Sequence, residues 1–359
     1  MTITKQNKDA PPRDSIGGTK AAAILGRSKW TTPFGAWKDL CDALDGKLEE
    51  REATEPMLRG LLAEDPLIEY ASQAFTDDTG LKIESLGGDG ILRHPEHGFI
   101  HGTPDRILFN SEGVPVGILE FKTYDSKNGD FDWCRSDYQT QLNHYAHLLE
   151  IQPWFKTKYP NGKLAQNYLM VATANYFRWK DIVSFIVRGY DPEPLFENVE
   201  VEWSLIGGLD EYASQDLPQL TDFWEAFVVP REAPPLDGSE QAKNYIDQIA
   251  GERNGTLILT ESESKTVEEL VGKETRLKEQ AKWIDAELST IKNQIRNSLG
   301  SNERIVAGSV TIRASKRSGR SSFDDKALAK QHPEIHSQFV RPGKPYTVVT
   351  KSKTKETNK

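Results

Sequence analysis

The stretch GILEFKT, residues 117–123, most constrains the fold, because its pattern predicts a β-strand with two different faces. Side chains on a strand alternate between faces. One face carries Leu119, Phe121 and Thr123, and the other carries Ile118, Glu120 and Lys122. The second face sets a carboxylate and an ammonium about 7 Å apart at their backbones. A solvated ion pair on a half-exposed strand would explain this pair equally well, so its meaning depends on its neighbours.

The strand has a predicted partner that supplies a second carboxylate. FIHGTPDRILFN (99–110) predicts a strand, SEG (111–113) a hairpin turn, and VPVGILEFKT (114–123) the returning strand. Paired strands lie about 4.8 Å apart, so Asp105 and Glu120 can meet at one end of the pair and share a cation. A hard cation such as Mg²⁺ prefers oxygen ligands. With Lys122 beside it, this arrangement suits metal-assisted phosphodiester hydrolysis.

Two further side chains are candidates for the same site. RGLLAEDP (59–66) places Glu64 on a helix, where it could add a carboxylate, although an ordinary solvent-facing glutamate fits as well. YQTQLNHY (138–145) places Gln141 on the helix that follows the strand pair, where it could contact a water or a DNA phosphate. His101 is expected to be structural, and His144 and His147 are expected to lie on a helix surface.

Length and composition limit the classes of protein to which this chain can belong. The 359 residues suffice for one large domain or two ordinary ones, with a globular composition. Two cysteines are too few for a disulfide framework or a four-cysteine metal site, and fit a reducing cytoplasm. No secretory signal or membrane helix is expected. Although the net charge is −9, the C-terminal segment 301–359 is basic. The simplest interpretation of this segment is a solvated tail.

The rest of the first two thirds alternates helices and strands. Thr32-Pro33 predicts a helix start, with Thr32 as the N-cap. Further helices are expected over 56–75, 138–149 and 217–229, and strands over 164–175 and 181–190. The Pro- and Gly-rich stretch 231–239 predicts a boundary.

Beyond that boundary, apolar residues recur every three, four or seven positions, which is typical of a coiled-coil seam. They are Val267, Leu270, Leu277, Ala281, Ile284, Leu288, Ile291 and Ile295. Gly272 and Glu274 interrupt the first part, which favours an antiparallel helical hairpin or packing within the chain over a long parallel coiled coil. Strands at 308–315 and 345–352 and a helix at 324–331 follow.

The expected organisation is therefore a disordered N-terminus (1–14), a nuclease domain (15–235), a helical or coiled-coil segment (240–300) and a small basic α+β module with a tail (301–359). Residues 266–299 are expected to pack apart from the nuclease domain.

Several stretches together resemble a known family, the YqaJ-type viral recombinases, in the phage lambda exonuclease branch of the PD-(D/E)xK nucleases. The matching stretches span residues 13–150 in the family's order: IGGTKAAAILGRSKWTTPFGAWKD, RGLLAEDPLIEYAS, GTPDRILF, GILEFKT and YQTQLNHY. The resemblance implies a restriction-endonuclease-like α/β core, with a mixed central sheet flanked by helices.

The resemblance also implies roles for individual residues. Asp105, Glu120 and the backbone carbonyl of Phe121 would be metal ligands, and Lys122 the catalytic lysine. Glu64 matches the family's helix glutamate, but the extra residue in AEDP makes Asp65 an alternative. Gln141 matches the glutamine of the following helix.

A terminal 5′-phosphate would be held in a small polar pocket. Arg13, Thr19 and Thr103 match its arginine and hydroxyl positions, with threonine in place of serine twice and the arginine one residue out of register.

The resulting expectation is a Mg²⁺-dependent deoxyribonuclease, with Mn²⁺ as a substitute. Its activity would be that of a 5′→3′ double-stranded DNA exonuclease of phage recombination, leaving 3′ single-stranded overhangs. An endonuclease or a single-strand-preferring nuclease of the same core is the nearest alternative, and a non-catalytic DNA-binding or scaffolding protein is another. The resemblance implies duplex DNA ends, a phage single-strand annealing protein and further copies of the chain, in a trimeric ring, as partners.

Overall fold

The structure is a computed structural model that divides into two compact units at Ile249/Ala250. Most of the segment 1–14, which is expected to be disordered, lies outside the described residues, because these begin at residue 12. The strand expected at 345–352 also lies outside them. The described residues are 12–47, 53–87, 90–160, 162–207, 211–251, 255–308, 310–314 and 324–339.

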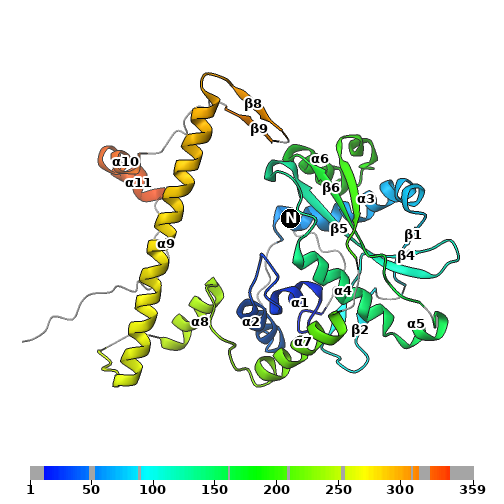
Figure 1. The fold of residues 1–359 in the computed structure, drawn as a ribbon, viewed down its shortest axis with the longest axis horizontal. Coiled ribbons are helices and arrows are strands. Elements are labelled where there is room, and N and C mark those ends of the chain that lie inside the picture. The colour runs from blue at the N-terminus through cyan, green and yellow to red at the C-terminus, as the bar shows by residue number, and fades with distance from the viewer. Residues whose placement is uncertain are drawn as a thin grey trace, which may run out of the picture. The chain divides into compact units, whose positions relative to one another are not determined.

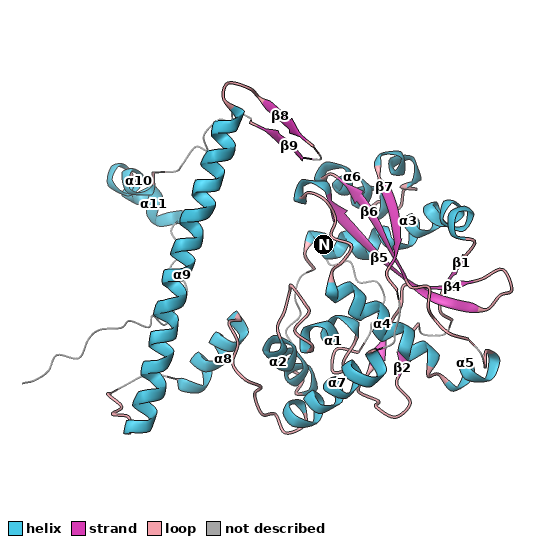
Figure 2. Ribbon diagram, viewed as in Figure 1, coloured by secondary structure: helices cyan, strands magenta, loops and turns pink. Residues whose placement is uncertain are grey.

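The first unit is built on a mixed five-stranded sheet in the order β1-β4-β5-β6-β7 (Figures 1 and 2). The strands are β1 (Lys82–Glu84), β4 (Arg106–Phe109), β5 (Pro115–Asp125), β6 (Tyr168–Ala174) and β7 (Glu200–Leu205). The β5–β6 pair is parallel and the other three pairs are antiparallel. This mixed α/β architecture is compatible with the expected nuclease core.

The central strand β5 contains GILEFKT and separates two hydrophobic cores, as its alternation predicts. Ile118 belongs to one core, and Leu119 and Phe121 belong to the other. Gly117 is required where the chain passes the carbonyl of Gln166, because a Cβ there would lie 1.8 Å from that oxygen. The strand is therefore fixed on both faces.

Helices cover both faces of the sheet (Figure 1). One core includes residues of α1 (Gly18–Ile24), α2 (Pro33–Leu44) and α4 (Ser136–Glu150). The other includes residues of α3 (Glu55–Thr79) and α6 (Tyr176–Val187). The start at Thr32-Pro33 is confirmed, because the Thr32 hydroxyl accepts a hydrogen bond of 3.1 Å from Gly35 N.

The predicted hairpin of β4 and β5 is confirmed. Asn110 Oδ1 accepts hydrogen bonds from Glu112 N and Val114 N, and Gly113 takes the left-handed conformation that the turn needs, with φ of 73°. The preceding strand is shorter than predicted. Residues 101–102 form β3 (His101–Gly102), paired with β2 (Leu92–Arg93), and the chain breaks before β4 because Pro104 cannot donate to a sheet.

The strand predicted at 181–190 is wrong, because this segment belongs to α6. Asn175 caps the helix by accepting a hydrogen bond of 3.0 Å from Arg178 N. Trp179 and Ile182, three residues apart, are buried on one helical face. This helical spacing of the buried side chains outweighs the preference of the Ile- and Val-rich sequence for a strand.

The helix predicted at 217–229 is confirmed but begins earlier. The π-helical turn η3 (Tyr212–Asp216) leads into α7 (Leu217–Phe223), and a second π-helical turn, η4 (Trp224–Val228), follows it. The remaining helical elements of this unit are η1 (Ser126–Asn128), α5 (Pro153–Lys158) and η2 (Glu193–Asn198).

The helix α8 (Glu240–Ala250) packs on the first unit. The Tyr245 ring lies edge-on to Phe34 and Trp37, with centroids 5.5 and 5.4 Å apart, and Ala242 is buried. The first unit therefore extends past the expected boundary at 235–240.

The second unit contains one 39-residue helix, α9 (Glu261–Leu299). A capping box of Thr260 and Glu263 starts it, and Gly300 follows its last residue. The helical hairpin expected over 266–299 is wrong, because no turn interrupts this segment. Local helix-forming sequence across Gly272 outweighs the cost of a single glycine.

Two short motifs complete the second unit. The strand expected at 308–315 is confirmed as β9 (Val310–Arg313), with an unexpected partner, β8 (Arg304–Ala307). The predicted helix at 324–331 is confirmed as α10 (Asp325–Gln331), and α11 (Pro333–Phe339) follows. No helix in the described ranges is both long and apolar enough to cross a membrane.

Candidate active site

The carboxylates of Asp105 and Glu120 meet at the end of the β4–β5 pair, as the sequence predicts. Arg106 pairs with Leu119, so the same antiparallel register sets Asp105 opposite Glu120. Asp105 Oδ2 accepts a hydrogen bond of 2.7 Å from Phe121 N. This bond ties Asp105 to the strand that carries Glu120.

Glu120 is buried, and its two oxygens have different surroundings. Oε1 accepts a hydrogen bond from the Lys122 ammonium, whereas Oε2 is buried with no hydrogen-bond partner. Burial alone lowers the pKa of Lys122, but the charges of Glu120 and Asp105 outweigh it and raise that pKa well above its usual range. Lys122 therefore stays protonated beside Glu120.

Glu64 of α3 joins these two carboxylates and Asp65 does not. Burial, and then the charge of Glu120, raises the pKa of Glu64 to about 7. Burial and the charges of Glu120 and Glu64 likewise raise the pKa of Asp105 well above its usual range. Asp65 is exposed and forms an ion pair of 2.6 Å with Arg106. The structure thus favours Glu64 over Asp65 as the helix carboxylate of the site.

The donor set of this acid–lysine cluster (Glu64, Asp105, Glu120 and Lys122) fits a hard divalent cation. Besides burial, the charge of Glu120 raises the pKa of Glu64 and of Asp105, and a cation would relieve that repulsion. The unpartnered Glu120 Oε2 supplies an oxygen that lacks a donor. Among the described residues no group of three or more His, Cys, Asp or Glu side chains is already arranged as a metal site. The carbonyl of Phe121 as a further ligand stays a prediction.

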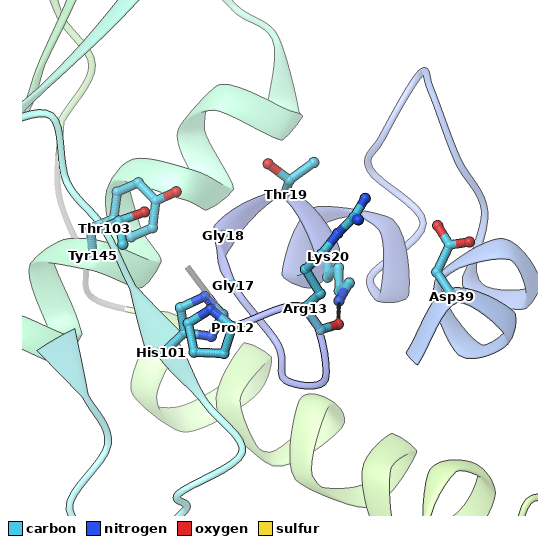
Figure 3. Close-up of a pocket in the computed structure, with 10 residues that line it drawn as sticks. All are labelled: Pro12, Arg13, Gly17, Gly18, Thr19, Lys20, Asp39, His101, Thr103 and Tyr145. Atoms are coloured by element: carbon cyan, nitrogen blue, oxygen red, sulfur yellow. Dashed lines mark hydrogen bonds between the residues drawn. The ribbon is translucent and has the colours of Figure 1, made fainter. Parts of the chain in front are cut away.

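A pocket of about 240 Å³ collects the three residues expected to bind a 5′-phosphate (Figure 3). Arg13 comes from the N-terminal loop, Thr19 from α1, and Thr103 from the link between β3 and β4. In Figure 3, Thr103 lies beside Tyr145 on one side of the pocket, and Thr19 and Arg13 lie on the other. Three distant segments are therefore brought to one polar pocket.

The pocket contains a second cationic residue, Lys20, that the sequence analysis did not identify. Its ammonium donates a hydrogen bond of 3.2 Å to Ser15 O and another to Arg13 O. Burial, which outweighs the opposing charge of Asp39, lowers the pKa of Lys20 to about 8. The only sequence signal was its position directly after Thr19, in GGTK.

Helix α4 connects this pocket to the acid–lysine cluster. Gln141 Nε2 donates a hydrogen bond of 2.8 Å to Thr19 Oγ1, and Gln141 Oε1 is buried without a partner. Tyr145 lines the pocket and hydrogen bonds with Thr103. Burial, then the charges of Glu120 and Asp105, raise the pKa of Tyr145 well above its usual range. Because the charges of the cluster act on Tyr145, which lines the pocket, the pocket and the cluster are neighbours.

His101 has the structural role expected of it, whereas the helix-surface position expected of His144 is wrong. His144 is buried, with one ring nitrogen bonded to the Tyr212 hydroxyl and the other 2.7 Å from His101 O. His101 Nδ1 lies 3.0 Å from Ser15 Oγ, and burial lowers its pKa to about 4. Both are therefore neutral at pH 7.

The fold and these two adjoining sites define a mixed α/β protein with a carboxylate–lysine cluster beside a basic pocket. The family model of the YqaJ-like viral recombinase domain matches residues 12–152. This segment therefore carries a YqaJ-like viral recombinase domain, which confirms the resemblance seen in the sequence, and it contains every predicted site residue. The chain is also 25% identical over 334 residues to "Uncharacterized protein YqaJ" of Bacillus subtilis (strain 168), covering 92% of this chain and 88% of that protein.

Proposed function

We propose that this protein is a Mg²⁺-dependent 5′→3′ exonuclease of double-stranded DNA that acts in phage recombination and leaves 3′ single-stranded overhangs. The observation that carries the proposal is the adjacency of two different sites. The acid–lysine cluster suits phosphodiester hydrolysis, and the neighbouring pocket suits a terminal phosphate. Tyr145 connects them, because it lines the pocket and the charges of Glu120 and Asp105 act on it.

The cluster residues have separate tasks in this proposal. Asp105, Glu120 and Glu64, with the Phe121 carbonyl, would hold Mg²⁺ or Mn²⁺, which supplies an activated water and polarises the scissile phosphate. Lys122 stays charged because Glu120 and Asp105 surround it, so it can donate a hydrogen bond to the scissile phosphate or the attacking water. Gln141 Oε1, buried and unpartnered, can accept a hydrogen bond from that water.

The pocket residues would select the DNA end. A terminal phosphate carries more charge than an internal one, and charge-assisted hydrogen bonds from Arg13 and Lys20 favour it. The hydroxyls of Thr19 and Thr103 can donate to its remaining oxygens. A terminal phosphate seated there brings the first phosphodiester bonds of the strand toward the cluster.

One experiment tests the activity and separates its alternatives. Linear duplex, covalently closed circular duplex and single-stranded DNA are incubated with the protein in Mg²⁺ or in EDTA. The proposal predicts that only the linear duplex is degraded, and only with Mg²⁺. The 3′ part of each of its strands should be retained as single-stranded DNA. Cleavage of the circle would indicate an endonuclease, and faster loss of single strands would indicate a single-strand nuclease.

The same experiment addresses the non-catalytic alternative. A DNA-binding or scaffolding protein would shift the DNA in a gel and cleave none of it. Buried, mutually repelling carboxylates weigh against that alternative, because they cost stability without a structural benefit. A trimeric ring and a phage single-strand annealing protein as partner stay predictions from the resemblance.

A further inference from the structure

The long helix α9 carries an apolar seam that the second unit leaves exposed. The eight seam residues, Val267 to Ile295, all have exposed side chains, at 39% to 62% for the Val, Leu and Ile members. Within the described part of the chain, Leu299 at the last turn is the buried residue of α9. A helix of this length with an unburied stripe needs a partner to bury it.

The spacing of the seam identifies the kind of partner. From Leu277 onward the steps alternate strictly between four and three residues, which assigns Ala281, Leu288 and Ile295 to a positions and Leu277, Ile284 and Ile291 to d positions. This narrow two-residue stripe matches another helix of the same period rather than a broad groove. We propose that α9 pairs with α9 of a second copy of this chain, in the antiparallel direction.

The direction follows first from Glu274, which occupies an a position. A parallel pair aligns each a position with itself, so it would bury two Glu274 carboxylates against each other. An antiparallel pair aligns a with d and sets Glu274 opposite Ile291 near the edge of the paired region. There Glu274 keeps its own ion pair of 2.8 Å with Lys278.

The flanking charges agree with this direction. In the antiparallel register, Lys278 of each copy lies opposite Asp285 of the other, so the two-fold axis generates this favourable pair twice. In the parallel register Lys273 would face Lys278, a repulsive contact. Glu287 and Lys292 would attract each other in the parallel pair, but an exposed flanking pair contributes less than a buried like-charge contact costs.

The same register matches apolar side chains along the helix. It sets Leu270 opposite Ile295, Leu277 opposite Leu288, and Ala281 opposite Ile284, and the two-fold axis repeats each match. Both ends of the pair are therefore apolar, and the register can be tested at its ends.

The first test compares two full-length variants by light scattering. Ile284→Glu places a carboxylate in the seam, and Ala286→Glu, its matched control, places one on the opposite face two residues away. We expect the wild type and Ala286→Glu to have the same mass, at least twice that of Ile284→Glu. Equal masses for all three would overturn the proposal and indicate that the seam packs within its own chain or on a different protein.

The second test fixes the direction with cysteines at the two ends of the seam, without placing a charge in it. Full-length Leu270→Cys and Ile295→Cys chains, both in a Cys134→Ser background, are produced together with different affinity tags and mildly oxidised. We expect a disulfide between the two different chains. In either variant alone, the cysteines of an antiparallel pair lie roughly 37 Å apart at 1.5 Å per residue, far beyond disulfide reach.

Each outcome of the second test is decisive. Cross-linking between different chains and not within either single variant supports the antiparallel pair. Efficient cross-linking of each single variant would show a parallel pair, and no cross-linking in any combination would show that this seam does not join two copies.

Discussion

The acid–lysine cluster and the pocket that Arg13, Thr19 and Thr103 line adjoin each other, yet they are built in opposite ways. Glu120 and Lys122 belong to the central strand β5, and Glu120 is buried. Arg13 and Thr19 belong to a loop and a short helix, and both are exposed. Chemistry needs charges held in a rigid, low-dielectric setting, whereas binding of a chain end needs access. Changes in the cluster should therefore abolish cleavage, and changes in the pocket should alter which ends are cleaved.

The largest effect is expected from the cluster itself. Glu120→Gln, Asp105→Asn and Lys122→Ala should each lower the rate of DNA hydrolysis by on the order of 10²–10³-fold or more, since each removes a charge that acts on the reacting phosphate. The loss should be the same on 5′-phosphorylated and 5′-hydroxyl duplex. Initial rates with both substrates, and circular dichroism of each variant, check this. Near-normal cleavage by either β5 variant would show that GILEFKT is not the catalytic strand.

Glu64 and Asp65 offer a matched pair within one helix turn. Glu64→Gln should lower the rate about 10²-fold, because its side chain shares the electrostatic environment of Glu120. Asp65→Asn should leave the rate within roughly threefold, because Asp65 is exposed and bound to Arg106. Rates at saturating Mg²⁺ measure both. A larger loss for Asp65→Asn would reverse the assignment of the helix carboxylate.

The sequence predicted the cluster better than the pocket for a physical reason. The alternation of β5 and the short hairpin turn fix Asp105 opposite Glu120 through local geometry alone. The pocket depends on long-range packing of the N-terminal loop, α1 and α4, which no local pattern reveals. The resemblance supplied Arg13, Thr19 and Thr103, but the partly buried Lys20 became evident only from the fold.

The prediction of the fold from the sequence has the same limits. The β5 strand and the cap at Thr32 follow from local rules. The strand expected at 181–190 failed because Asn175 caps a helix whose buried face, Trp179 and Ile182, packs on the sheet. The hairpin expected within α9 failed because a single Gly272 is too weak a helix breaker to force a turn.

The pocket should control end selection with a moderate effect. Arg13→Ala and Lys20→Met should each reduce the preference for 5′-phosphorylated over 5′-hydroxyl duplex about tenfold, by removing one charge-assisted contact. Their rates on 5′-hydroxyl duplex should stay near those of the wild type. Lys180→Met, at an exposed lysine of α6, serves as the control. No preference in the wild type would exclude the pocket while leaving the cluster intact.

A smaller effect is expected from pH. The pKa of Lys20 is about 8, so the ammonium is charged below that pH and loses its proton above it. The preference for a 5′-phosphate should therefore fall by a few-fold as the pH rises past about 8, and a bound phosphate should move this fall upward. Lys20→Arg should keep its preference through pH 9. Competition between the two substrates across this pH range measures the effect, and a pH-independent ratio would contradict it.

The smallest expected effect is on stability. Burial, and then the charges of Glu120 and Glu64, raise the pKa of Asp105, so its charged form is destabilised in the folded state, and lowering the pH toward that pKa should stabilise the protein. Asp105→Asn removes the charge and keeps an acceptor for Phe121 N. Without Mg²⁺ it should raise the melting temperature by about 2–4 °C at pH 7, while Thr19→Ala in the pocket should not. A lower melting temperature for Asp105→Asn would show that the cluster is not under electrostatic strain.

The most direct test of the central claim, that the pocket and the cluster work as one site, is the size of the first labelled product. A linear duplex carrying a labelled 5′-phosphate is digested briefly with Mg²⁺ by the wild type and by Glu120→Gln. Because Tyr145 adjoins both sites, the wild type should first release labelled fragments of one or a few nucleotides, and Glu120→Gln should bind the duplex and release none. First products of many nucleotides, or equal release by the variant, would contradict the account.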